Sequence, residues 1–358
     1  MKNRPIILVL DAGGTNLVFN AVQDGIVIGN HVTLPAPSEN LNRFLQKLIT
    51  GFETVNHQCG NGAAAISFCF PGPADYENGI IDDLENLPFF RGGVPLKHIL
   101  ENQFNIPVFI NNDGDLFTLG EAIGGVLPEI NHQSKKRYKN LLGVTLGTGF
   151  GGGIVINNRL LTGDNSAAAE INRMSNILNS NQSAEEMLSI RGVKRAYAES
   201  AEIDISTCPE PFDIYKIATG SKQGNQKAAL AAWDKLSVVL ADALANAITL
   251  TDSNVVIGGG LSGAHPVFLL KTVELLNGYF TTYENRKVPR MEIKAYSWHN
   301  DEERKRFLQS NTKEIKVPFS NETVQWESDK KIAISVSKLG TSQAVALGAY
   351  HFAVERLY

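Results

Sequence analysis

The segment Leu141–Ile156 reads LLGVTLGTGFGGGIVI and decides the fold. An apolar run, Leu142–Leu146, enters a loop that carries glycine at positions 147, 149, 151, 152 and 153, and a second apolar run leaves it. Two strand-like runs joined by a glycine loop predict a β-hairpin. Glycine lets backbone amides approach a ligand closely, and successive N–H groups in such a loop form a concavity that suits an anion. The segment therefore predicts a phosphate-binding hairpin.

Other interpretations of this loop are possible. Glycine loops also close ordinary hairpins with no ligand. The string G-x-G-x-x-G at Gly147, Gly149 and Gly152 fits a dinucleotide fingerprint, but that motif needs a helix after the loop. A strand-like run follows here, which argues against dinucleotide binding, and the sequence contains no G-x-x-x-x-G-K-[ST] string.

A second copy of the pattern lies near the N-terminus, in Ile6–Val22, IILVLDAGGTNLVFNAV. Here an apolar run enters the loop Asp11–Asn16, and another run leaves it. Two copies of strand, glycine turn and strand suggest two related halves. We expect each half to present one loop to the phosphates of a nucleotide in the cleft between them.

Composition narrows the class of protein. A chain of 358 residues exceeds the usual size of one core, so we expect two domains. The net charge of −4 gives no electrostatic footprint for nucleic acid or anionic lipid. Met1–Pro5 leads directly into a strand-like run of only five apolar residues before Asp11, which is too short for a signal peptide, and no apolar run approaches the roughly 20 residues of a membrane span. Three scattered cysteines fit a reducing cytoplasm. We expect a cytoplasmic protein.

Hydrophobic periodicity places helices and strands between the two glycine loops and after them. Residues 25–33, 63–70, 108–110 and 254–257 are expected to be strands, and residues 41–52, 96–104, 115–123, 183–199, 225–250 and 342–357 to be helical. The alternation of strands and helices predicts an α/β sheet whose strand ends hold the ligand. The polar segment 297–331 is interpreted as a surface insertion.

Seven short motifs occur in order along the chain. They are Asp11–Asn16, Phe70–Pro73, Asn86–Pro88, Asn112-Asp113 with Gly120-Glu121, Gly147–Gly153, Gly258–Ser262 and Ser337–Gly340. Together they resemble the ROK family of sugar kinases and sugar-responsive repressors, and most closely its glucokinase-like members. The resemblance implies an actin-like ATPase fold (ribonuclease H-like). Its two lobes would be residues 1–120 with 342–358, and residues 121–341, around a nucleotide and sugar cleft.

The resemblance also implies roles for the matched residues, with ATP and Mg²⁺ as cofactors. Asp113 would be the general base, and Asp11 would hold Mg²⁺ through water. Sugar contacts would come from Asn86, Asn112, Asp113, Glu170 and Glu185. ATP would be bound by Asp11, Gly13, Gly14, Thr15, Asn16, Gly147, Thr148, Gly149, Gly151, Gly258, Gly259, Gly260 and Leu261. The family further implies a homodimer.

The sequence departs from the family pattern in one region. Where the family has E-x-G-H, this chain has Glu170-Ile171-Asn172-Arg173, and no cysteine cluster for zinc follows. We therefore expect no zinc, since structural zinc requires four Cys or His ligands. Arg173 would either pair with one of Glu170, Glu185 and Glu186 or contact the substrate directly. In both cases the sugar preference should differ from that of a zinc-bearing glucokinase.

The expected activity is ATP-dependent phosphorylation of a hexose or N-acetylhexosamine. One alternative is a sugar-sensing repressor of the same family, but the first phosphate motif starts within ten residues of Met1, where we expect no room for a DNA-binding domain. Another is a sugar-binding protein that has lost turnover, which the presence of Asp11, Asp113 and both loops disfavours. The sequence does not name the sugar.

Overall fold

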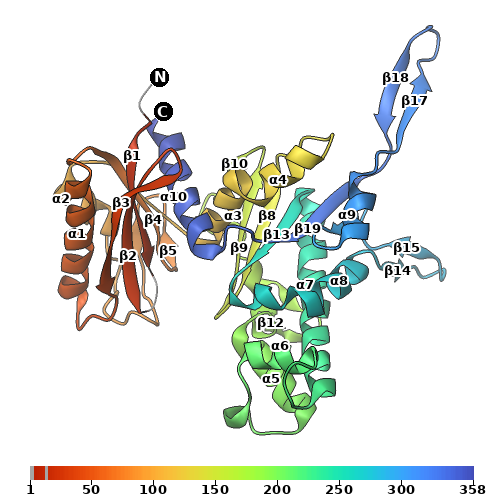
Figure 1. The fold of residues 1–358 in the computed structure, drawn as a ribbon, viewed down its shortest axis with the longest axis horizontal. Coiled ribbons are helices and arrows are strands. Elements are labelled where there is room, and N and C mark those ends of the chain that lie inside the picture. Colours follow the sequence, from red (N-terminus) through yellow and green to blue (C-terminus); the bar gives the residue numbers. More distant parts are fainter. Residues whose placement is uncertain (1–3, 13–14) are drawn as a thin grey trace. The chain divides into compact units, whose positions relative to one another are not determined.

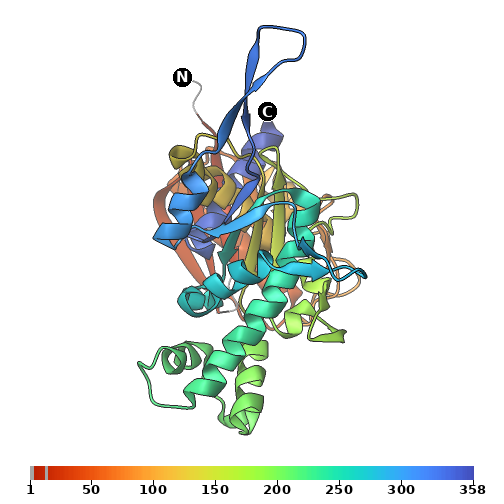
Figure 2. The ribbon, with the colours of Figure 1, turned by 90° about the vertical axis from the view of Figure 1, so that its right-hand side faces the viewer.

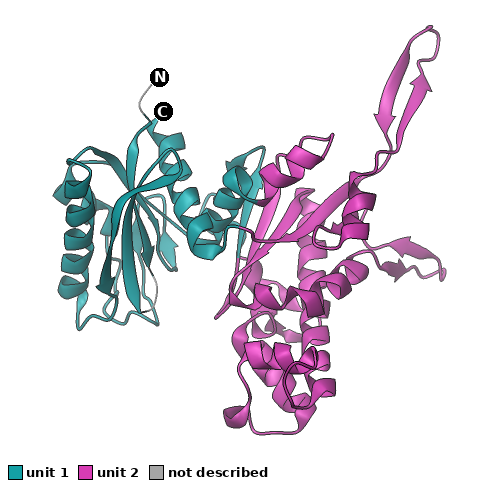
Figure 3. Cartoon of the chain, viewed as in Figure 1, with its two compact units in different colours: residues 1–125, 152–169, 339–358 teal, residues 126–151, 170–338 magenta. Residues whose placement is uncertain are grey.

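The computed structural model describes residues 4–12 and 15–358, which form two compact units (Figure 1, Figure 3). The first unit comprises residues 1–125, 152–169 and 339–358, and the second comprises residues 126–151 and 170–338. The chain crosses between the units at several points, and one of these, after Gly151, lies inside strand β9. The lobe boundaries expected from the sequence, 1–120 with 342–358 and 121–341, stay a prediction.

Strands and helices alternate along most of the chain. The first unit contains β1 (Ile6–Ala12), β2 (Asn16–Gln23), β3 (Ile26–Pro35), α1 (Leu41–Gln58), β4 (Ala63–Cys69), β5 (Ala74–Asp75), β6 (Ile80–Ile81), α2 (Leu96–Phe104), β7 (Val108–Asn111), α3 (Asp113–Gly124), β10 (Arg159–Leu160) and α10 (Thr341–Leu357), and β9 spans Phe150–Ile156. The second unit contains α4 (Val126–Gln133), β8 (Leu141–Leu146), η1 (Ile171–Arg173), β11 (Ser175–Asn176), β12 (Asn179–Ser183), η2 (Ala184–Glu186), α5 (Ile190–Ala201), η3 (Ile205–Thr207), α6 (Pro211–Ala218), α7 (Gln226–Thr251), β13 (Asn254–Gly258), η4 (Gly260–Ala264), α8 (His265–Leu276), β14 (Tyr279–Thr281), β15 (Lys287–Pro289), β16 (Lys294–Ser297), α9 (Asp301–Leu308), β17 (Thr312–Lys316), β18 (Thr323–Glu327) and β19 (Lys331–Val336).

Both predicted hairpins are confirmed. β1 pairs antiparallel with β2, with Ile6 opposite Gln23 and Ala12 opposite Leu17. β8 and β9 are neighbours in a second sheet, and β9 continues into the short strand β10. The first hairpin's Gly13 and Gly14 lie outside the described residues.

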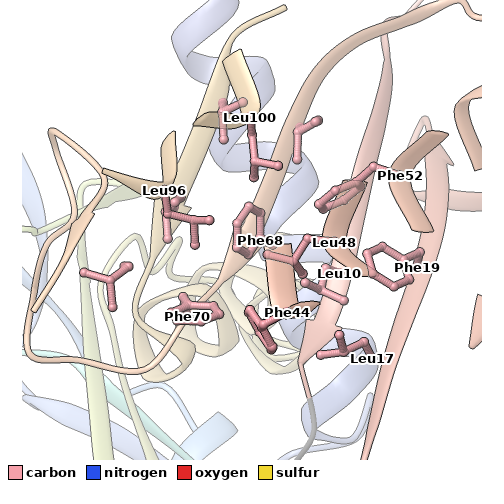
Figure 4. Packing of buried hydrophobic residues seen from close by; sticks show 14 of the residues in the cluster. Leu10, Leu17, Phe19, Phe44, Leu48, Phe52, Phe68, Phe70, Leu96 and Leu100 are labelled. Carbon is pink, nitrogen blue, oxygen red and sulfur yellow. The ribbon is translucent and has the colours of Figure 1, made fainter. Parts of the chain in front are cut away.

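The first sheet has the strand order β3-β2-β1-β4-β7, and β1, β4 and β7 are parallel. Side chains alternate between the two faces of a strand, and consecutive residues of β1 are buried. Both faces of this sheet are therefore covered. α1 packs on one face, and α10, together with α3, packs on the other (Figure 1). The core beneath α1 is rich in phenylalanine: Phe44 and Phe52 of the helix meet Phe19 and Phe68 of the strands, and Phe44 also meets Phe70, which follows β4 (Figure 4). Full burial of one such side chain stabilises the fold by about 1.5–3 kcal/mol.

The second unit is organised around the parallel strands β8, β13, β19 and β16, which are neighbours in that order. The long helix α7 packs against α8 and α5 and buries apolar side chains along most of its length, including Trp233 and Leu240 (Figure 2). The predicted core helix at residues 225–250 is thereby confirmed.

Two predictions about local structure need correction. The helix expected over 183–199 begins at Ile190, because the Ser189 side chain accepts a hydrogen bond from the Gly192 N–H and caps the helix there. The segment 297–331 is only partly a surface insertion. Ser297 ends β16 and Lys331 begins β19, and both are buried in the sheet. Between them, β17 and β18 form a ribbon that projects from the second unit (Figure 2).

Candidate active site

Three strands of the first sheet end side by side. Leu10 of β1 is opposite Phe68 of β4, and Cys69 of β4 is opposite Asn111 of β7. Asp11, near the end of β1, and Asp113, two residues after β7, therefore lie at the same end of these strands, on either side of Cys69. The pKa of the Cys69 thiol is raised well above its ordinary value, first by burial and then by the negative charges of Asp113 and Asp11. The structure thus brings two of the predicted functional carboxylates together within the first unit.

Helix α3 positions Asp113 at its first turn. The Gly114 N–H is shared by Asn112 Oδ1 and Asp113 Oδ1, each at 2.8 Å, so both predicted site residues act in the cap of this helix. The Asp113 side chain remains open to solvent on one side. Desolvation by the surrounding protein nevertheless raises the pKa of Asp113, and the N–H groups of Gly114 and of Asp113 itself offset part of the rise. A carboxylate with a raised pKa is a stronger base, which suits a proton acceptor.

The first turn of α3 rests directly on β9. A Cβ on Gly114 would lie 2.4 Å from the Gly152 carbonyl oxygen, and one on Gly153 would lie 2.4 Å from the Gly114 carbonyl oxygen. Side chains at these positions would push the helix off the strand. Gly153, which the sequence assigned to a phosphate motif, therefore serves close packing that fixes the start of α3.

In the second unit a carboxylate fixes the predicted phosphate loop. Glu185 Oε2 accepts a hydrogen bond from the Phe150 N–H at 3.0 Å, and Glu185 Oε1 pairs with Arg191 Nη2 at 2.9 Å. Glu186 also pairs with Arg191, at 2.8 Å, and with Arg195, at 3.3 Å. Because Arg191 pairs with both Glu185 and Glu186, its planar guanidinium holds the two carboxylates in fixed positions.

Two other contacts shape this end of the second unit. The Ile190 N–H at the start of α5 donates to the Gly147 carbonyl at 2.8 Å, so the electropositive end of a helix adjoins the loop. Gly259 has φ of +83°, and a Cβ there would lie 2.3 Å from the Leu146 carbonyl oxygen. The motif Gly258–Ser262, whose first four residues are expected to bind ATP, thus packs against the end of β8, the strand that enters the predicted phosphate loop.

The predicted site residues divide between the units. The first unit holds Asp11, Thr15, Asn16, Asn86, Asn112 and Asp113, and the second holds Gly147, Thr148, Gly149, Gly151, Glu170, Glu185, Gly258, Gly259, Gly260 and Leu261. Within each unit, strand ends or loops gather several of them. Asn86 and Glu170 are exposed.

The expectation that Arg173 pairs with a neighbouring glutamate is wrong. Arg173 is exposed and forms no ion pair with the described residues, and Glu185 and Glu186 pair with Arg191 and Arg195 instead. The sequence offered one signal for this arrangement: Arg191 and Arg195 stand four residues apart, on one face of the predicted helix.

No set of three His, Cys, Asp or Glu side chains gathers as a metal site within residues 4–12 and 15–358. A single carboxylate such as Asp11 fits Mg²⁺, which keeps several waters and needs only one or two carboxylates beside the phosphates of a substrate. The absence of zinc stays a prediction. In the same described residues no helix combines the length and apolarity of a bilayer span.

Comparisons with known proteins agree on one family. The model of the ROK family matches residues 7–302. The structure of a glucokinase from Parabacteroides distasonis is 44% identical in sequence, covers 99% of this chain and 98% of its own, and superposes with a TM-score of 0.89. A glucokinase from Thermotoga maritima is 28% identical over 307 residues, which are 80% of this chain and 93% of that protein.

An N-acetyl-D-glucosamine kinase from Yersinia enterocolitica is 27% identical over 276 residues, covering 72% of this chain and 85% of the relative. The ROK hexokinase from Thermus thermophilus is 20% identical, with a TM-score of 0.69 over 98% of this chain and 99% of that chain, and shares the fold. The expected α/β fold is thereby confirmed.

Proposed function

Because the chain belongs to the ROK family, we propose that it transfers the γ-phosphoryl group of ATP to a hydroxyl group of a hexose or N-acetylhexosamine. The observation that carries this proposal is that Asp11 and Asp113 both lie near Cys69, where the parallel strands of the first unit end. Phosphoryl transfer needs a base at the acceptor oxygen and compensation of phosphate charge, and these two carboxylates can serve the two needs.

Asp113 would accept the proton of the sugar hydroxyl as its oxygen attacks the γ-phosphorus. Asn112 uses Oδ1 to cap α3, which leaves its amide Nδ2 to donate to a sugar oxygen. Asn86, Glu170 and Glu185 are the other proposed sugar contacts. Positioning of the two substrates would supply much of the rate, since correct orientation alone can lower a barrier by several kcal/mol.

The phosphates would be held by backbone N–H groups of the two glycine loops. Residues 13–16 form one proposed loop and residues 147–151 the other, and Gly258–Leu261 would contact the adenosine. Mg²⁺, held through water by Asp11, would neutralise charge on the β- and γ-phosphates. The Gly147 N–H donates to the Gly149 carbonyl at 3.0 Å, so this loop turns tightly.

The identity of the sugar is tested by a coupled assay for ADP release over hexoses, N-acetylhexosamines and pentoses. Arg173 replaces the family histidine, so we propose that glucose is a mediocre substrate and that another sugar is preferred. A glucose kcat/KM near 10⁵ M⁻¹s⁻¹ or above, unmatched by any other sugar, would contradict this preference. Absence of ADP release with every sugar would contradict the kinase and favour a non-catalytic sugar-binding protein or a regulator.

We also propose a cytoplasmic homodimer that binds neither nucleic acid nor membrane. The ribbon β17–β18 supports self-association, because Ile315, Val324 and Trp326 share one of its faces and all three are exposed. Sedimentation at several protein concentrations tests the dimer. A monomer over the whole concentration range would contradict it.

A further inference from the structure

A cavity of about 320 Å³ lies within the first unit, along strand β7. β7 is the last strand of its sheet, so one of its edges has no neighbouring strand. Residues 108–111 of β7, the start of α2, the end of α10 and residues 162–166 line the cavity. No residue proposed above to bind ATP or sugar is among the lining residues. The cavity is at the lower end of the size range of small-ligand pockets, about 300–1,000 Å³.

One lining residue carries a buried polar atom that needs a partner. Asn111 is 2% exposed, and its Oδ1 accepts the Asn112 N–H at 2.8 Å. Its Nδ2 is buried and makes no hydrogen bond with the described residues. A buried donor without a partner destabilises the protein, so a ligand that supplies an acceptor would be bound the more tightly.

A cationic side chain, that of Arg356, is also among the residues that line the cavity. The Arg356 guanidinium lies over the Phe352 ring at 3.7 Å, and Phe352 is held edge to face by Phe109. Among the described residues, Arg356 makes no ion pair or hydrogen bond of its own, although Glu77 and Glu355 are close enough to stabilise its charge. Arg356 is exposed, and partial desolvation by the neighbouring protein lowers its pKa, although the guanidinium keeps its charge at neutral pH.

A second cation and an anion complete the wall. Lys97 Nζ donates to the Glu77 carbonyl oxygen at 3.1 Å, and the side chains of both residues line the cavity. The cavity is thus lined by two cations and one amide donor, together with the carboxylates of Glu77 and Asp115. A guanidinium beside an ammonium matches a phosphate or carboxylate group, and a carboxylate acceptor matches a hydroxyl group.

We infer that this cavity is a second ligand site, separate from the proposed active site, for a small polyhydroxylated anion such as a sugar phosphate or a sugar acid. Arg356 and Lys97 bind the anionic group, Asn111 Nδ2 donates to a ligand oxygen, and Glu77 accepts from a hydroxyl group. Phosphorylated sugars and sugar acids share this chemistry, and both are used as probes.

Calorimetric titration of the full chain tests the site, with glucose 6-phosphate, gluconate, inorganic phosphate and glucose as separate probes. Arg356→Gln should weaken binding of the polyhydroxylated anion by about tenfold or more, because hydrogen bonds to charged groups are the strong ones. Glu77→Gln should lower the preference of the site for the polyhydroxylated anions over inorganic phosphate, because an amide oxygen accepts from a hydroxyl group more weakly than a carboxylate does. Arg43→Gln makes the same charge change at an exposed position of helix α1 in the same unit, and it should not change the affinity for any probe.

The readout is binding and not turnover, so the result is independent of the proposed kinase activity. A probe that binds the proposed active site instead would retain its affinity in Arg356→Gln, and that outcome would overturn the inference. Equal affinity for inorganic phosphate and both polyhydroxylated anions would also overturn it, because the hydroxyl contacts would then contribute nothing. Arg356→Lys, which keeps the charge and loses the planar fork, should fall between the wild type and Arg356→Gln.

Discussion

Glu185 accepts the backbone N–H of Phe150 at 3.0 Å, so a carboxylate holds the exit of the glycine loop that was expected to bind phosphate. A Cβ at the neighbouring Gly149 would lie 2.7 Å from Glu185 Oε2. The residue expected to contact sugar is therefore also a support for the loop. Arg191 forms an ion pair with this carboxylate and balances its charge.

Gly149→Ala should displace the Glu185 side chain while leaving the fold intact, because the clash is with the far end of a flexible side chain. We expect the KM for ATP to rise severalfold and the free energy of unfolding to change by less than about 1 kcal/mol. Gly263→Ala, where an added Cβ meets nothing within 4 Å, is the control. An unchanged KM for ATP would show that the Phe150–Glu185 contact does not shape the loop.

Asp113→Asn should lower kcat by about 10²–10⁴-fold, because the amide keeps the acceptor for the Gly114 N–H but cannot take a proton. Binding of ATP and sugar should be nearly unchanged, since the carboxylate acts chiefly in the transition state. Asp75→Asn, an exposed aspartate of the same unit, is the matched control. Near-normal kcat in Asp113→Asn would rule out Asp113 as the base.

The raised pKa of Asp113 sets the acid limit of activity. The base works only when deprotonated, so kcat should fall as the pH drops through this pKa, at a higher pH than for an ordinary aspartate near 3.9. Desolvation by the surrounding protein raises this pKa although Asp113 itself is exposed, so protonation sets in at a higher pH and activity is retained on the alkaline side. A pH profile of kcat measures this fall on the acid side. A midpoint at or below pH 3.9 would contradict the role of Asp113 as the base.

His299 should make stability sensitive to acid. The Val336 N–H donates to His299 Nε2 at 2.9 Å, so this nitrogen must be unprotonated. Burial lowers the pKa of His299, His265 and Arg304 add to that effect, and Glu129 opposes it. The unfolded chain therefore binds more protons, and the contribution of His299 to stability is present above pH ~6.5 and declines below it. Denaturant unfolding at pH 7.5 and 5.5 should show a larger loss in the wild type than in His299→Gln, and equal losses would refute this role.

Removal of the ribbon β17–β18 should leave the second unit folded and able to bind ATP. The Ser328 hydroxyl donates to the Asn311 carbonyl at 3.3 Å at the base of the ribbon, so an Asn-Gly turn can join residues 311 and 328. ATP binding by the shortened chain is measured by calorimetry, with circular dichroism to confirm folding. Loss of ATP binding in a folded variant would contradict the placement of the ribbon outside the nucleotide site.

Much of the fold was predictable from local sequence. Strand runs, glycine turns and helix periodicity identified both hairpins and most helices, because each depends on residues that are near one another in the chain. The start of α5 was missed by several residues, since the Ser189 cap and the preceding turn outweighed the apolar pattern of 183–199. The order of the seven motifs was enough to identify the family.

Other features depended on pairing between distant segments. The sequence alone supplied Asp11 and Asp113 as candidates, but only the parallel register of β1, β4 and β7 placed them at the same end of these strands, near Cys69. The sequence also suggested Glu185 as a sugar contact. Only the tertiary structure showed that Glu185 accepts a hydrogen bond from the Phe150 N–H and forms an ion pair with Arg191. Local sequence fixes the backbone path of each element, because the forces involved act between neighbours. The choice of partner for a charged side chain depends on which distant groups tertiary packing brings within a few ångströms.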